Sequence, residues 1–314
     1  MNELVCKYRL SAFLSAILLS ATIAPVKANE ASLYDFDPVP QKLAQYARNS
    51  AATYLNQGLQ WIQSGRTQDA INAFNQAIQL DPSLAPAHYN LGLALRQVGQ
   101  FQPAADAFYR ATQVDPKFAL AKANLGGALL EGNNFTQAEN YLQQALKLDS
   151  KLGVAHYNIG LLQQQKEDCR KAVRSFRKAM KYSNKAPEPA YQIGLCYMQE
   201  RKFKKATNAF KDAVKINPKY SEAHYNLGSI LYTQGKHQQA LEAFRKAAEA
   251  NPKYPSAYYG AGLAFIQMKQ YPDAMRVLQY SRDLFLAQNN TLWASNAEQL
   301  MEKAQNFTYQ IPPQ

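Results

Sequence analysis

Glycine recurs along this chain in one phase, at a fixed interval of 34 residues. It occupies that phase seven times: Gly58, Gly92, Gly126, Gly160, Gly194, Gly228 and Gly262. Two further tracks keep the same interval, one of alanine (Ala70, Ala104, Ala138, Ala172, Ala206, Ala240 and Ala274) and one of Phe or Leu (Phe74, Phe108, Leu142, Phe176, Phe210, Phe244 and Leu278). A period of this length is typical of arrays in which each repeat is one supersecondary unit stacked on the next. Seven such repeats fill residues 51–288 without an insertion.

Each repeat has the pattern of two helices joined by a short turn. In residues 85–118 the helical spacing of apolar residues is interrupted at Gly99 and resumes until Pro116, which ends the second helix. Gly92 falls inside the first helix, where glycine costs about 1 kcal/mol relative to alanine. We therefore expect the two helices to approach closely at this point, with Gly92 facing the small Ala104 of the second helix.

The repeats resemble tetratricopeptide repeats, when positions are counted from residues 51, 85, 119, 153, 187, 221 and 255. Position 4 is Tyr or His in five repeats, positions 7–8 are Leu-Gly or Ile-Gly in five, position 24 is aromatic or Leu, and position 32 is often Pro. The departures are Gln163 at the large position 11, and Ser150 and Asn184 at the proline position. The resemblance implies an all-α fold, a right-handed superhelical solenoid of about seven helix-turn-helix repeats.

Both ends of the chain have their own patterns. Residues 1–28 predict a secretory signal peptide, because Lys7 and Arg9 precede a short apolar run and small residues precede Asn29. We expect export to the periplasm or an equivalent compartment such as the thylakoid lumen, and no transmembrane span, although an uncleaved anchor is the alternative. Residues 29–50 predict a linker and an N-terminal cap, and residues 289–314 predict a capping helix and a tail.

The residues that enzymes and metal sites require do not form a recognisable pattern. His88, His156 and His224 are 68 residues apart, always at position 4 of alternate repeats, so they cannot converge on one ion. The chain has no HExxH motif, no glycine-rich phosphate loop and no GxSxG motif. We therefore expect no catalytic residues, no metal and no cofactor.

One stripe of the first helices carries Tyr, Leu and Asn rather than charged residues. In tetratricopeptide arrays this stripe lines a groove that binds peptides or helices, and the amides of position 6 could hold a peptide backbone. The predicted groove residues are Asn56, Tyr89, Asn90, Leu93, Asn124, Tyr157, Asn158, Leu161, Tyr191, Gln192, Leu195, Tyr225, Asn226, Tyr232 and Tyr259. The function predicted is a non-catalytic scaffold that binds a protein partner. The alternative is that these residues pack on neighbouring repeats.

Positive charge is concentrated in the middle of the array. The formal net charge of the chain is +12, and residues 166–219 alone carry fifteen Lys or Arg against five Asp or Glu. The predicted basic patch consists of Arg170, Arg174, Arg177, Lys178, Lys181, Lys204, Lys205, Lys211 and Lys215. The alternative function is a peripheral protein that binds anionic lipid or cell-wall polymer through this patch. A merely solvated face is the other interpretation, and nucleic acid is not an expected partner after export.

Two cysteines, Cys169 and Cys196, follow the predicted signal peptide. An oxidising compartment would permit a disulfide between them. In stacked repeats, the start of one second helix lies near the end of the next first helix, which could bring the two residues within reach. The alternative is a pair of small buried thiols.

Overall fold

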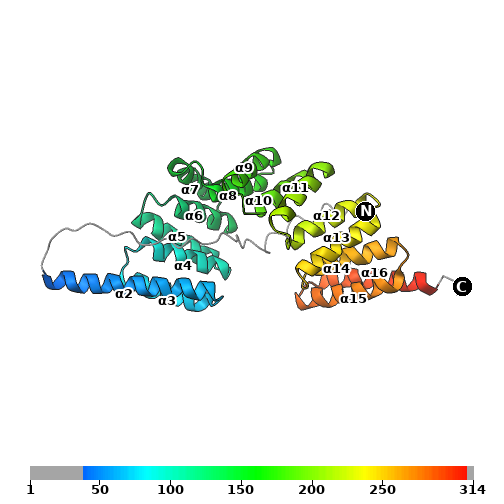
Figure 1. Cartoon of the computed structure of the whole chain (residues 1–314), viewed down its shortest axis with the longest axis horizontal. Coiled ribbons are helices and arrows are strands. Elements are labelled where there is room, and N and C mark those ends of the chain that lie inside the picture. Colours follow the sequence, from blue (N-terminus) through cyan, green and yellow to red (C-terminus); the bar gives the residue numbers. More distant parts are fainter. Residues whose placement is uncertain (1–37, 310–314) are drawn as a thin grey trace. The chain divides into compact units, whose positions relative to one another are not determined.

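The structure is a computed structural model that describes residues 38–309, with side chains from 45 to 307. The expected signal peptide, residues 29–37 of the linker and the last residues of the tail lie outside this range. Every regular element in the described range is an α-helix (Figure 1). The chain divides into two compact units, one ending at Ala186 and one beginning at Pro187.

The N-terminal unit contains four helix pairs, each pair being one repeat. Its helices are α2 (Pro38–Gln63), α3 (Thr67–Leu80), α4 (Ala85–Gln97), α5 (Phe101–Val114), α6 (Ala119–Glu131), α7 (Phe135–Leu148), α8 (Gly153–Gln165) and α9 (Cys169–Tyr182). Residues 41–50, expected to begin a helix that covers repeat one, are helical and continuous with the first helix of that repeat in α2.

The C-terminal unit contains three helix pairs and a final helix. These are α10 (Glu188–Gln199), α11 (Phe203–Ile216), α12 (Ser221–Thr233), α13 (His237–Ala250), α14 (Pro255–Gln267), α15 (Tyr271–Ala287) and α16 (Thr291–Tyr309). The expected all-α repeat solenoid is thereby confirmed. α16 packs along α15 and buries Ala297 and Ala304, as expected of a capping helix. None of the helices in the described range is long and apolar enough to cross a membrane.

The repeats stack in two layers within each unit. First helices contact first helices of the next repeat, as α6 contacts α8 and α12 contacts α14. Each second helix also contacts the first helix that follows it, as α5 contacts α6 and α13 contacts α14. The first helices therefore form one face of each unit, and the second helices form the other.

The in-phase glycines make room for the ring at position 24, not for the alanine at position 20. A Cβ at Gly92 would lie 2.7 Å from Cδ1 of Phe108, and the other in-phase glycines meet the position-24 side chain of their own repeat in the same way. The nearest side chain to Gly92 is therefore Phe108 and not the expected Ala104, although in repeat three the backbone oxygen of Ala138, at position 20, is also 3.2 Å from a Cβ at Gly126. The glycine leaves room for Phe108, which is completely buried.

A left-handed residue joins the two helices of every repeat at position 15. Three of these joints are glycine (Gly65, Gly99 and Gly235), and four are not (Asn133, Glu167, Arg201 and Lys269). Each joint is closed by a bond from the next N–H back to a carbonyl five residues earlier, such as Lys202 to Tyr197 at 2.8 Å. This is the bond of a Schellman helix end, which requires φ above zero at the joint.

Candidate binding surfaces

The tyrosines at position 5 belong to the core of the repeats. Tyr89, Tyr157 and Tyr225 are all buried. The ring of Tyr89 lies 5.7 Å from that of Phe108 in its own repeat and 5.0 Å from that of Phe118. The prediction that these three tyrosines line an open groove is therefore wrong, and truncating them would damage the fold. Position 5 contacts the second helix, which a stripe drawn on an isolated helix does not reveal.

Tyr191 and Tyr259 are only half-buried, but their rings are also packed within the array. The ring centroid of Tyr191 lies 5.6 Å from that of Phe210, and Tyr259 meets Trp293 of α16 edge-on at 5.3 Å. Burial raises the pKa of Tyr89 above its usual value. Its hydroxyl therefore stays protonated well into the alkaline range.

The amides at position 6 hold the array together instead of facing solvent. Asn124 donates to the hydroxyl of Tyr89 at 3.2 Å, and Asn226 donates to the hydroxyl of Tyr191 at 3.2 Å. Each bond joins one repeat to the repeat before it. Asn90 donates to a carbonyl of its own helix, that of Pro86, at 2.8 Å.

The amide nitrogens of Asn90, Asn124, Asn158 and Asn226 already donate hydrogen bonds within the chain. The structure therefore does not contain the expected ladder of amides that face an incoming peptide. Asn56 is the exposed member of the series, and Gln192 is half-buried.

Asn158 makes the tightest of these contacts between repeats. Its amide donates to the carbonyl of Ala123 in the preceding first helix at 3.0 Å. A Cβ at Gly127 would lie 2.8 Å from the same amide nitrogen, so the glycine there permits the approach. Position 9 holds Leu in five of the other repeats and Ser in the sixth. In repeat three Gly127 has no side chain at this position, and the space is used by the hydrogen bond between the helices.

The predicted groove residues that stay partly accessible are fewer and more apolar. Leu93, Leu161, Leu195 and Tyr232 are half-buried and lie on the first helices. Burial raises the pKa of the Tyr232 hydroxyl, and a hydrogen bond with Gln267 partly opposes that shift. Leu93 and Leu161, rather than the position-5 tyrosines, contribute apolar side chains to the first-helix face of the N-terminal unit, and Leu195 and Tyr232 do so in the C-terminal unit.

The first-helix face also contains a largely buried ion pair that was not predicted from the sequence. Arg96 donates through Nε to both carboxylate oxygens of Glu131 at 3.0 Å, and through Nη2 to Oε1 at 2.7 Å. The two side chains are only 10% and 16% exposed. The residues are 35 apart, one at position 12 and one at position 13 of successive repeats, which is the signal that could have paired them. A bidentate pair of this kind fixes the register between α4 and α6.

Gln163, which departs from the family pattern at position 11, has a polar partner in its own repeat. The hydroxyl of Ser175 donates to its amide oxygen at 2.8 Å. Both residues sit where most repeats have apolar side chains. The exchange replaces an apolar contact with a satisfied hydrogen bond.

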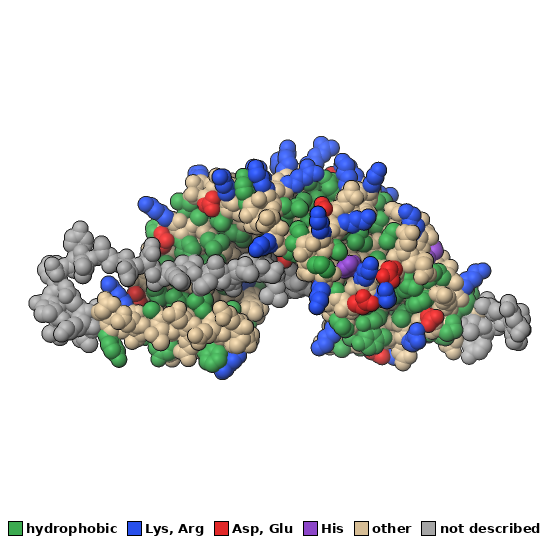
Figure 2. Space-filling view, viewed as in Figure 1, with side chains coloured by type: hydrophobic (Ala, Val, Ile, Leu, Met, Phe, Trp, Pro, Cys, Tyr) green, Lys and Arg blue, Asp and Glu red, His purple; other side chains and the backbone are tan. Residues whose placement is uncertain are grey.

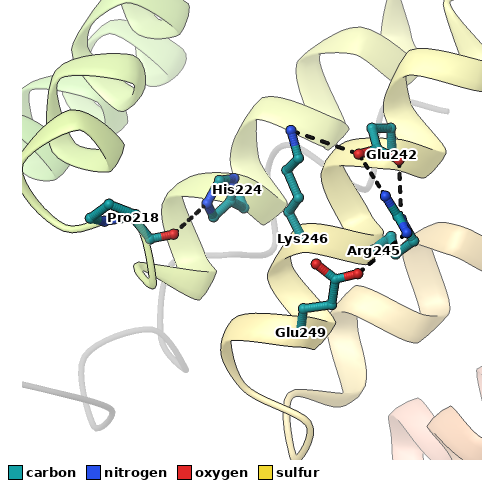
Figure 3. A network of polar contacts seen from close by, with 6 residues as sticks. All are labelled: Pro218, His224, Glu242, Arg245, Lys246 and Glu249. Carbon is teal, nitrogen blue, oxygen red and sulfur yellow. Dashed lines mark hydrogen bonds and ion pairs between the residues drawn. The ribbon is translucent and has the colours of Figure 1, made fainter.

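The three histidines at position 4 have a structural role. Each places Nε2 against a backbone carbonyl six residues earlier: His88 on Pro82 at 2.9 Å, His156 on Ser150 at 3.0 Å and His224 on Pro218 at 2.9 Å (Figure 3). In repeat seven the hydroxyl of Tyr258 donates to Pro252 instead, at 3.2 Å. No group of three or more potential ligands that could hold a metal occurs in the described part of the chain.

All residues of the predicted basic patch are exposed, on two second helices. Arg170, Arg174, Arg177, Lys178 and Lys181 lie on α9, and Lys204, Lys205, Lys211 and Lys215 lie on α11. Figure 2 shows Lys and Arg side chains gathered over the region that Figure 1 labels α9. The helices belong to different compact units, so each forms a basic surface of its own.

Cys169 at the start of α9 and Cys196 in α10 are both buried, and they belong to different compact units. The disulfide between them stays a prediction, with a pair of small buried side chains as the alternative.

Comparison with solved structures places this arrangement of helix pairs in the class of α-helical repeat solenoids. A chain of the APC/C hetero-tetramer Cut9–Hcn1 superposes with a TM-score of 0.63 at 17% identity, over 72% of this chain and 46% of that one. PilF of Pseudomonas aeruginosa gives 0.56 at 20% identity, over 69% and 97%. TTC0263 of Thermus thermophilus gives 0.52 at 20% identity, over 58% and 99%. These likenesses show the fold.

The family follows from the sequence of the repeats. Models described as tetratricopeptide repeat match residues 85–118, 119–152, 191–255 and 231–281, and one described as TPR repeat matches residues 58–99. Together they cover more than half of the chain, which belongs to the tetratricopeptide repeat family. No curated protein matches it.

Proposed function

We propose that this protein is a non-catalytic scaffold that binds a segment of a protein partner on the face formed by its first helices. Membership in the tetratricopeptide repeat family supports the general role of a protein–protein interaction scaffold. The observation that carries the finer proposal is the set of half-buried leucines on that face. Leu93 and Leu161 are accessible enough to be touched, and each is held on a helix packed rigidly against its neighbours.

The chemistry of this face suits an apolar or amphipathic segment. Apolar side chains give affinity when a partner covers them, and a few such residues carry most of the binding energy of an interface. Arg96 and Glu131 neutralise each other. The pair therefore adds polar atoms to this face without requiring a charged group on the partner. An amphipathic helix could lay its apolar side on Leu93 and Leu161.

The test measures peptide binding and stability on the same variants. Short random peptides are selected on the full chain, and their affinities are then measured for the Leu93→Glu and Leu161→Glu variants. We expect each variant to lose about tenfold or more in affinity, the effect of an interface hot spot. Both leucines also pack on the apolar core of the N-terminal unit, so the melting temperature is measured with the affinity, and each variant must remain folded at the assay temperature. The matched control is Gln143→Glu, an exposed position on α7 with the same change in charge. Selected peptides that bind both leucine variants like the parent would contradict the proposal.

The proposal includes an exported location. It is supported by the basic start, short apolar run and small-residue exit of residues 1–28.

A further inference from the structure

The outward face of α9 is a continuous positive surface on a rigid helix. The helix carries six basic residues and no Asp or Glu between Cys169 and Tyr182. Four of them, Arg170, Arg174, Arg177 and Lys181, are spaced 4, 3 and 4 residues apart, so they stand one above another on successive turns. Lys171 and Lys178 flank this row. The row extends for about 16 Å at 1.5 Å per residue.

Two carboxylates beside α9 form ion pairs with lysines. Asp168, just before the helix, pairs with Lys171 at 2.8 Å, and this contact, with a weaker contribution from Arg174, holds the pKa of Asp168 below its usual value. Lys166 lies before α9 and pairs with Glu139 of α7 at 2.7 Å. Like charges on successive turns of a helix repel one another. A bound anion would relieve that repulsion.

The equivalent helix two repeats later shows the neutralised form of the same surface. In α13, Arg245 and Lys246 occupy the positions of Arg177 and Lys178, 68 residues on. Arg245 pairs with Glu242 at 2.9 Å and with Glu249 at 3.4 Å, and Lys246 pairs with Glu242 at 3.7 Å (Figure 3). At the two positions of those carboxylates, α9 has Arg174 and Lys181. The two helices thus occupy the same position in their repeats, and they differ because α13 carries two carboxylates where α9 carries two cations.

The other side of α9 restricts the kind of anion that could bind. Cys169, Val173 and Phe176 are buried, and the helix packs against α8. Helices that lie in a membrane surface bury such an apolar side among the lipids, whereas here it belongs to the core of repeat four. Among the exposed large apolar side chains of the described range, α9 contributes only Tyr182, at its end. The accessible chemistry is therefore a row of cations without an apolar anchor.

We propose that the outward face of α9 binds a linear polyanion, a flexible polymer with phosphate, sulfate or carboxylate groups spaced about one helical turn apart. The guanidinium groups of Arg170 and Arg174 can each pair with two oxygens of one anionic group. Lys181 continues the row as a point charge. This site lies on the second-helix face, away from the leucines of the proposed protein-binding face. The experiments on the two surfaces therefore test the two proposals independently.

The experiment converts α9 into the pattern of α13. The double variant Arg174→Glu, Lys181→Glu recreates the carboxylates of Glu242 and Glu249 beside Arg177 and Lys178. Binding of long-chain polyphosphate to the full chain is measured by fluorescence anisotropy over a range of salt concentrations, together with the melting temperature. We expect the double variant to bind at least tenfold more weakly at low salt, with a shallower salt dependence. Its melting temperature should be unchanged or raised, because like-charge neighbours become ion pairs.

The control has the same change in net charge elsewhere on the surface. Lys253→Glu, Lys303→Glu replaces two exposed lysines outside α9 and should leave polyphosphate binding within twofold of the parent. Equal weakening by both double variants would assign the binding to net charge and overturn the proposal. Parent-like binding by the α9 variant would also overturn it. A third arm uses vesicles of phosphatidylglycerol and phosphatidylcholine: tighter binding to vesicles than to polyphosphate at equal anion concentration would replace the polymer with a membrane surface.

Discussion

Glu188 is a carboxyl group placed where its charge is costly. It is 6% exposed at the start of α10, and its Oε2 has no hydrogen-bond partner in the described part of the chain. Burial raises the pKa of Glu188 above its usual value. A negative charge in the first turn of a helix gains about 0.3–1 kcal/mol from the helix dipole. An unsatisfied buried polar group costs about 1–3 kcal/mol, so the cost dominates.

The substitution Glu188→Gln should therefore stabilise the protein at pH 7, by about 1 kcal/mol. Because the folded state holds the proton more tightly than the unfolded state, the wild-type protein loses stability as the pH rises from the unfolded pKa of about 4.3 through the raised folded pKa. The gain from glutamine should therefore be largest at pH 7 and disappear below about pH 4. Urea unfolding of both proteins across this range measures it.

Glu222, at the same position of the next repeat, provides the control. It is half-exposed and accepts a hydrogen bond from Ser221 at 2.9 Å. Glu222→Gln should give no gain at pH 7. A gain equal to that of Glu188→Gln would show that the burial of Glu188 is not the cause.

The position-5 tyrosines show how far single residues could be predicted. Their 34-residue interval identified them as one set, and the first-helix assignment was right. Whether that side of the helix faces solvent or the second helix depends on how one helix is rotated against the other. A one-dimensional pattern does not contain that rotation, so Tyr89 and Tyr225 were expected in a groove and are core residues instead.

At the scale of the helix pair, the left-handed joint is the element that sequence analysis overlooked. Gly99 was recognised as an interruption, but the same position in other repeats holds Glu167, Arg201 or Lys269, which give no turn signal. The helix boundaries on either side repeat with the 34-residue period, and the Schellman bonds recur with them. Tertiary stacking therefore imposes the left-handed conformation on residues that do not favour it.

Arg201→Gly should stabilise the array. A left-handed conformation costs a non-glycine residue about 1–2 kcal/mol, and glycine adds about 0.5–1 kcal/mol of unfolded-state entropy in the opposite direction. The expected net gain is about 0.5–1 kcal/mol, measured as a shift of the denaturation midpoint.

The reverse change, Gly99→Arg, should cost a similar amount. A Cβ at Gly99 would meet no atom within 4 Å, so any loss there comes from the backbone conformation and not from a clash. An unchanged midpoint in both variants would mean that the joints carry no strain.

At the scale of the whole molecule, the repeat number, the fold class and the capping helix could all be predicted, because they depend only on period and composition. The period alone does not identify the contacts that join one repeat to the next, among them Arg96–Glu131 and Asn124–Tyr89. Each pairs residues 35 apart, whereas the sequence period suggests partners 34 apart. The one-residue offset depends on how successive first helices pack on one another, which the period does not specify.

Export is the prediction that concerns the molecule as a whole. The protein isolated from its native source should begin at Asn29, because Val26 and Ala28 provide the small residues of a signal-peptide cleavage site. Intact mass and N-terminal sequencing measure it. A protein that keeps Met1 and the following residues would contradict cleavage at this site.

The unequal joints between helices also rank the repeats by how readily each one opens. Repeats one, two and six have glycine at the joint, whereas repeats four, five and seven hold Glu167, Arg201 and Lys269 there. In a linear array each repeat is supported only by its neighbours, so weaker repeats open first. Repeats four and five follow one another in the chain, on either side of the 186/187 boundary that divides it. Backbone amides of α8 to α11 should therefore exchange with deuterium before those of α4 and α5, so opening of the array is not confined to its ends.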